Sequence, residues 1–137
     1  MPASKEFAIR MQDRPGTLGK LSKALADKQV NILAFQSFPS SEGESTVRLV
    51  VDNPTTTKTV LDSERVKYSE NEVAQITLPN RPGELARAAS RLGDANININ
   101  YAYSGVDPGT SAPLLFFGVK EVSKAVPILD ETAAKAA

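Results

Sequence analysis

Hydrophobic and polar positions alternate with two different periods near the start of the chain. Phe7–Gln12 carries apolar side chains at every second position, which is typical of a half-buried β-strand. From Leu18 to Val30 the apolar residues instead return every three or four positions, which indicates an amphipathic helix. A Pro-Gly pair separates the two patterns. The sequence therefore begins with a strand, a tight turn and a helix.

The positions that follow predict a hairpin and a second helix. Two apolar, extended segments, Asn31–Phe38 and Thr46–Val51, flank the polar loop Pro39–Ser45. A helix is then expected over Thr55–Ser63 and a short strand over Val66–Ser69. The resulting order β-α-β-β-α-β predicts a split βαβ, ferredoxin-like unit with both helices on one face of an antiparallel sheet.

The whole pattern returns 67 residues later, which is the distance from Pro15 to Pro82. Sliding the chain by that distance superposes identical residues in both the strand and the helix segments. A match that holds its register through two kinds of segment indicates an internal duplication. We therefore predict an α+β protein of two units in tandem, residues 1–69 and 70–137, with antiparallel sheets side by side and helices on one face.

The end of the second unit departs from the first. Its expected elements include a strand over Val73–Leu78, extended segments over Asn98–Ser104 and Leu114–Val119, and a helix over Ser123–Ala134. Where the first unit has its last strand, the second has a run of alanine and lysine, and alanine favours helix over strand. The last strand of the second unit is therefore expected to be missing, with that edge open or covered by a partner chain.

Composition and charge exclude several classes of function. The chain has 137 residues, of which 41% are hydrophobic and 23% charged, as in ordinary globular proteins. Sixteen basic and sixteen acidic residues cancel, which argues against general nucleic-acid binding. The chain has no cysteine and no histidine, and no paired acids or phosphate-binding loop stand out, so we expect no metal site, no cofactor and no enzymatic activity. No apolar run is long enough for a membrane span or a signal peptide, so a cytoplasmic location is expected.

The two Pro-Gly loops are candidate ligand sites. Each enters a helix N-terminus, where free backbone N–H groups and the helix dipole favour an anion. Gly16 and Gly83 leave the backbone open to close approach, and Asp13 and Asn80 at the rim can accept hydrogen bonds from an ammonium group. A carboxylate receiver beside an ammonium receiver suits a free α-amino acid. The alternative is that each loop only makes a turn and caps its helix.

A second repeated feature is the Asn-Ile step that follows the first helix of each unit, at residues 31–32 and 98–99. Asparagine offers both hydrogen-bond donors and acceptors, although it is also common at helix ends because it tolerates left-handed backbone angles. In a split βαβ fold this step lies away from the Pro-Gly loop of its own unit. If the units pack side by side, the asparagine of one unit can approach the loop of the other.

These residues together resemble the ACT domain family. The resemblance rests on the loops DRPGTL and NRPGEL and on the steps VNI and INI, and it covers nearly the whole chain. It implies a regulatory protein without catalysis that senses a small allosteric effector, usually a free amino acid, between paired ACT units. It also implies a homodimer, with an enzyme or a regulator as a possible further partner.

The resemblance also implies the binding residues. In the first unit they are Met11, Asp13, Arg14, Gly16, Thr17, Leu18, Asn31 and Ile32, and in the second Leu78, Asn80, Arg81, Gly83, Glu84, Leu85, Asn98 and Ile99. Glu84 would occupy the field at the helix N-terminus that a ligand carboxylate needs. This favours the first loop for carboxylate capture.

An interaction protein on the same fold is the alternative function. Such a protein would no longer bind a small ligand, and would use the sheet edge near Ala133–Ala137 to bind an enzyme of amino-acid metabolism. Tyr101 and Tyr103 could contribute to its surface, although aromatic residues on strands are more often core.

Overall fold

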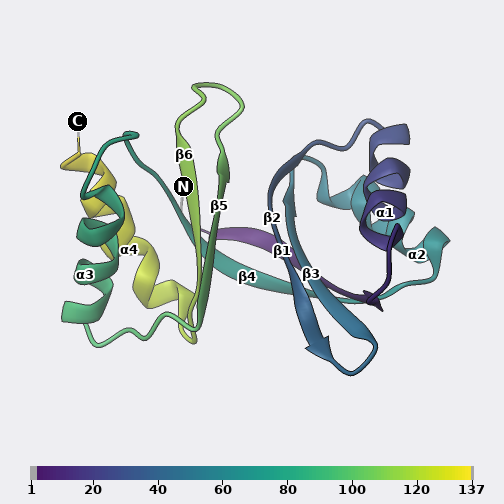
Figure 1. Ribbon diagram of the computed structural model, residues 1–137. Coiled ribbons are helices and arrows are strands. Elements are labelled where there is room, and N and C mark those ends of the chain that lie inside the picture. The colour runs from purple at the N-terminus through teal and green to yellow at the C-terminus, as the bar shows by residue number, and fades with distance from the viewer. Residues whose placement is uncertain (1–2, 137) are drawn as a thin grey trace. The chain divides into compact units, whose positions relative to one another are not determined.

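The computed structural model describes residues 3–136, and its elements follow the predicted order twice (Figure 1). In chain order the elements are β1 (Ala3–Gln12), α1 (Thr17–Asp27), β2 (Ile32–Ser41), β3 (Glu44–Val51), α2 (Pro54–Glu64), β4 (Lys67–Thr77), α3 (Glu84–Asp94), β5 (Tyr101–Val106), β6 (Pro113–Gly118) and α4 (Val122–Ala134). No helix within residues 3–136 is long and apolar enough to cross a membrane.

Two predicted segments differ from the structure. The strands expected over Val66–Ser69 and Val73–Leu78 form one continuous strand, β4, because no residue between them breaks the extended backbone. The polar loop expected over Pro39–Ser45 is mostly strand, since β2 ends at Ser41 and β3 begins at Glu44. A tight turn through Gly43, which has a φ of 76°, replaces the longer loop.

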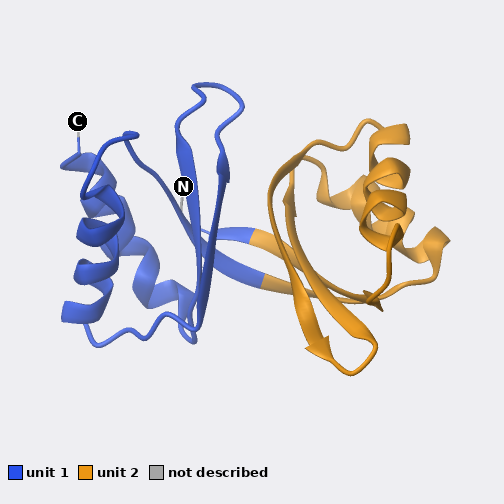
Figure 2. Cartoon of the chain, in the orientation of Figure 1, with its two compact units in different colours: residues 1–4, 72–137 blue, residues 5–71 orange. Residues whose placement is uncertain are grey.

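The chain divides into two compact units, shown in different colours in Figure 2. The N-terminal unit is Lys5–Asn71, in orange, and the C-terminal unit comprises residues 72–136 with residues 3–4, in blue. Both β1 and β4 therefore contribute residues to both units.

The N-terminal unit has the strands β1, β3 and β2 in an antiparallel arrangement that α1 and α2 cover. β3 pairs with both neighbours, for example Phe7 with Leu49 and Phe35 with Leu49. The alternate residues of β1 and β3 that face the helices form the core, because burial of this one face offsets the entropy of ordering the strands. The buried core residues include Phe7, Ile9, Leu21, Leu25, Val47, Leu49 and Leu61.

The C-terminal unit repeats this construction with β4, β6 and β5 and with α3 and α4. β6 pairs antiparallel with both neighbours, for example Ile76 with Leu115 and Tyr103 with Phe116. Its core occupies the same face, and the matched positions Leu25 and Leu92 are both 0% exposed. The buried core residues include Ala74, Ile76, Leu78, Ala88, Leu92, Phe117 and Leu129.

The last-strand position is filled differently in the two units. In the N-terminal unit the first half of β4 lies beside β1, where Lys5 pairs with Glu70 at 2.8 Å and Asn71 donates to Glu6 at 3.3 Å. In the described part of the C-terminal unit no strand follows α4. There the start of β1 lies beside β4 instead, and the Ser4 hydroxyl donates to the Gln75 side chain. The expected open edge thus borders the chain's own β1, and it gives no reason to require a partner chain there.

Candidate functional site

The loop between β1 and α1 presents an uncapped helix N-terminus. Gly16 precedes α1 in the left-handed conformation, with a φ of 92°, which glycine adopts without the steric cost that a Cβ brings. The Thr17 hydroxyl turns back to donate to the Gln12 carbonyl at 3.0 Å. No side chain caps α1, and its first turn contains no acidic residue. The Thr17 N–H donates to the Arg14 carbonyl at 3.4 Å, so the N–H groups that remain available to an anion are those of the next two residues, Leu18 and Gly19.

A cavity of about 420 Å³ lies beside this helix N-terminus. Its charged lining comes from β1, the loop, α1, β3, the end of α2 and the start of β4. The cationic lining residues are Arg10, Arg14, Lys20, Arg65 and Lys67, and the acidic ones are Glu44 and Glu64. We call this cavity the N-terminal site. Its volume lies within the usual range for small-molecule sites.

The N-terminal site has an excess of positive charge. Within the described part of the chain, no carboxylate lies within ion-pair distance of any of its five cationic side chains. The same residues contain no cluster of three His, Cys, Asp or Glu side chains that would hold a metal ion. The excess of positive charge in the lining favours an anion.

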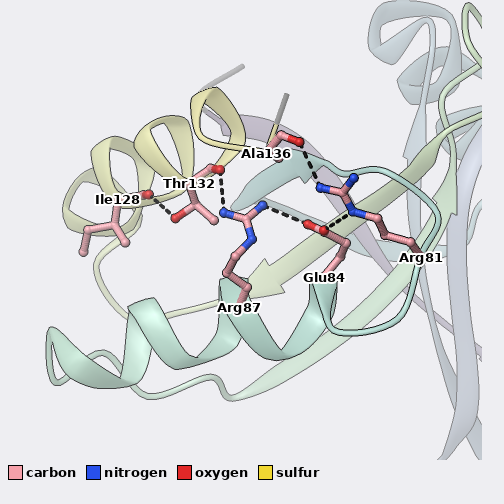
Figure 3. Close-up of polar contacts among 6 residues, drawn as sticks. All are labelled: Arg81, Glu84, Arg87, Ile128, Thr132 and Ala136. Carbon is pink, nitrogen blue, oxygen red and sulfur yellow. Dashed lines mark hydrogen bonds and ion pairs between the residues drawn. The ribbon is translucent and has the colours of Figure 1, made fainter.

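The second Pro-Gly loop has a similar backbone conformation, but an acidic residue follows it in the first turn of the helix. Gly83 precedes α3 with a φ of 88°, and Glu84 follows it at the first helical position with 9% of its surface exposed. Arg81 Nε donates to one carboxylate oxygen of Glu84 at 2.6 Å, and Arg87 Nη2 donates to the other at 2.8 Å (Figure 3). The two arginines thus hold one carboxylate at the start of α3.

The same two arginines also bind the end of α4. Arg81 Nη2 donates to the Ala136 carbonyl at 3.0 Å, and Arg87 Nη1 donates to the Thr132 carbonyl at 2.8 Å (Figure 3). The hydrogen bonds from Arg87 and then Arg81 hold the pKa of Glu84 below its ordinary value. The second loop is therefore filled by the chain's own carboxylate and serves as a clamp between α3 and α4.

Superposing the units by their 67-residue offset relates the two loops position by position. The N-terminal unit keeps both cations but has a threonine where the C-terminal unit has the carboxylate. The matched pairs are Arg14 with Arg81, Thr17 with Glu84 and Lys20 with Arg87. The second loop thus contains, inside the same molecule, the kind of group that the first loop lacks.

The structure brings together only part of the residue set expected in the N-terminal unit. Met11, Arg14 and Thr17 line the N-terminal site. Asp13 and Gly16 are exposed and are not part of the cavity lining, while Leu18 packs against the core. Asn31 and Ile32 follow the opposite end of α1, an 11-residue helix about 16 Å long, so the unit does not bring them to its own loop.

The expected residues of the C-terminal unit are also spread over several places. Arg81, Gly83 and Glu84 belong to the clamp, Leu78 is a buried core residue, and Asn80 and Leu85 are exposed. Asn98 donates to the Asn100 side chain at 2.9 Å and lines a separate cavity of about 480 Å³ beyond α3. Ile99 packs against the core.

Sequence reasoning missed most of the charged lining of the N-terminal site, namely Arg10, Lys20, Glu44, Glu64, Arg65 and Lys67. The predicted topology contains a signal that locates several of them. The last strand of a ferredoxin-like unit lies antiparallel to the first, so the start of β4 must lie near the end of β1. Charged residues at those two strand ends therefore meet beside the Pro-Gly loop.

The fold and the two loops define a protein of two ferredoxin-like units in tandem. The family model for the ACT domain matches the chain twice, over residues 6–63 and 73–129. The chain belongs to the ACT domain family, and the resemblance inferred from its sequence is confirmed.

Solved structures share this fold at low sequence identity. Protein BT0572 from Bacteroides thetaiotaomicron is 22% identical with a TM-score of 0.82, over 95% of this chain and 88% of that one. The regulatory subunit of aspartate kinase from Thermus thermophilus, in a ligand-free form, is 14% identical with a TM-score of 0.66, over 98% and 92%. The corresponding subunit from Thermus flavus is 12% identical with a TM-score of 0.64, over 99% and 93%. No curated protein sequence matches the chain.

Proposed function

We propose that this protein is a regulatory, amino-acid-binding protein whose N-terminal site receives the carboxylate of its effector. The contrast between the two loops carries this proposal. In the C-terminal unit a carboxylate lies between two cations at the start of a helix, while the N-terminal unit has both cations and no carboxylate. A ligand carboxylate would take the position that Glu84 occupies in the other unit.

The acidic lining of the N-terminal site supports an amino acid over a simple carboxylic acid. An α-amino acid needs an acceptor for its ammonium group near the carboxylate receiver. Glu44 and Glu64 provide carboxylate oxygens on the cavity wall. They take the role that the sequence assigned to Asp13, whose side chain is not part of the lining. The Asn-Ile steps at Asn31 and Asn98 stay a prediction for the contact with a paired ACT unit.

The decisive experiment is a thermal-shift screen of the intact chain against the twenty amino acids, with wild-type protein and Thr17→Glu. This substitution gives the first loop the acidic residue that the second loop has at the matched position, so the new carboxylate would lie between Arg14 and Lys20. A ligand present at about 100 times its dissociation constant stabilises the folded state by about 2.7 kcal/mol, which raises the melting temperature by several degrees. We expect one or a few related amino acids to stabilise the wild type and none to stabilise Thr17→Glu.

A regulatory subunit without a small ligand is the second candidate. It is favoured by the closed second loop and by the likeness to regulatory subunits of aspartate kinase. If no amino acid shifts the wild type, the amino-acid proposal fails. The next experiments would then be a pull-down with the purified chain, to find a protein partner, and sedimentation, to test the expected homodimer.

A further inference from the structure

We infer that the N-terminal site takes a ligand with two anionic groups, an acidic α-amino acid, rather than a neutral one. This inference rests on the proposed function and specifies its ligand class. It concerns the cations of the cavity lining that come neither from the Pro-Gly loop nor from α1.

Three further cations, which we call the second cluster, line the same cavity. Arg10 comes from the end of β1, Arg65 follows α2, and Lys67 begins β4. Arg14 and Lys20, by contrast, come from the loop and from α1. The lining thus has three cations besides Arg14 and Lys20, and a single ligand carboxylate between Arg14 and Lys20 would leave these three without an anionic partner.

The acids of the site do not neutralise this second cluster. The ion-pair geometry within residues 3–136 joins neither Glu44 nor Glu64 to any cation, and Glu44 accepts a hydrogen bond from the Ser41 hydroxyl at 3.1 Å. The five cations exceed the two acids by three charges. A neutral amino acid would leave that excess unchanged, whereas an acidic amino acid reduces it by one.

The fold does not require the second cluster. The C-terminal unit is built in the same way, yet its matched residues are Thr77, Thr132 and Ala134, none of them charged. Arg65 also adopts a left-handed backbone with a φ of 57°, at a helix end where glycine is the favoured residue. Arg65 thus places a charged side chain in the cavity lining although its backbone conformation is unfavourable for a residue with a Cβ.

Isothermal titration tests this ligand class with matched pairs of ligands. L-Aspartate and L-glutamate are compared with L-asparagine and L-glutamine, which have nearly the same shape and lack the second charge. We expect the better acid to bind at least tenfold more tightly than its amide. The double variant Arg65→Gln, Lys67→Gln should lose about tenfold in affinity for the acid and leave the amide unchanged. Lys28→Gln, an exposed cation at the far end of α1, is the control and should change neither.

The outcomes separate the two proposals. If an amide binds as tightly as its acid, the acidic ligand class is overturned while the amino-acid proposal stands. If the double variant keeps the full preference for the acid, the role of Arg65 and Lys67 as receivers of the second anionic group is overturned. If none of the twenty amino acids binds, both are overturned. Loss of acid binding in Thr17→Glu, together with loss of the acid preference in the double variant, would support both.

Discussion

The two Pro-Gly loops of this chain share a backbone and differ in what fills them. Gly16 and Gly83 have φ values of 92° and 88°, and each accepts a hydrogen bond at 2.9 Å from the N–H of the fourth residue after it. The second loop contains Glu84 between two arginines, whereas the first opens onto a cavity lined by cations. Closely similar loop geometry therefore serves a structural clamp in one unit and a candidate binding site in the other.

The second helices of the two units also end differently beside the Pro-Gly loops. In the C-terminal unit α4 runs on to Ala134, and carbonyls at its end accept hydrogen bonds from Arg81 and Arg87. In the N-terminal unit α2 ends at Glu64 and the chain turns into β4. Continuation of the helix thus supplies partners for the arginines, and its early end leaves their counterparts facing a cavity.

The largest expected effect comes from substituting the two loop glycines. Gly16→Val and Gly83→Val should each cost about 2 kcal/mol of stability, because a β-branched residue is strained at positive φ. A Cβ at either position would meet no heavy atom of the described residues within 4 Å beyond its chain neighbours, so the cost is confined to the backbone and is matched between the variants. Chemical denaturation measures both losses.

The ligand response should distinguish the two glycine variants. Gly16→Val is expected to lose the amino-acid-induced rise in melting temperature, and Gly83→Val to keep it. The reverse result would assign the ligand to the second loop and would remove the distinction between clamp and site.

A smaller effect is expected from Glu84→Gln, which removes the charge of the clamp and keeps its shape. Because the folded-state pKa of Glu84 lies below its ordinary value of 4.5, the carboxylate stabilises the fold above that pH, and this contribution is lost as the pH falls through the lowered pKa. Glu84→Gln should therefore melt a few degrees below wild type at pH 7, and the difference should shrink between pH 5 and pH 3. A difference that stays constant over this range would contradict a charged clamp.

The sequence predicted the duplication and the order of elements because both depend on local patterns. The hydrophobic periods of Phe7–Gln12 and of the helix that follows can be recognised from neighbouring residues alone, and the same periods return in the second unit. The sequence also predicts in part that Glu84 blocks ligand binding at the second loop, since an acid at a helix N-terminus competes with a ligand carboxylate. The hydrogen bonds of Arg81 and Arg87 to Ala136 and Thr132 could not be predicted, because these carbonyls reach the loop only through the packing of α4. Arg65 and Lys67 likewise reach the N-terminal site through topology rather than through any motif.

The smallest expected effect has the opposite sign and tests the cost of keeping Arg65 in the site. Arg65→Gly should raise stability by up to about 1 kcal/mol, because glycine relieves the left-handed backbone at this helix end, although its greater freedom in the unfolded chain offsets part of the gain. Gln29→Gly is the matched control, since Gln29 has a φ of 59°, is exposed and lies beyond the far end of α1. Denaturation should show a similar change in both variants, and titration with L-aspartate and L-glutamate should show weaker binding only in Arg65→Gly. Equal binding by the two variants would mean that the strained arginine has no part in the ligand site, and that the backbone cost at Arg65 is unrelated to ligand binding.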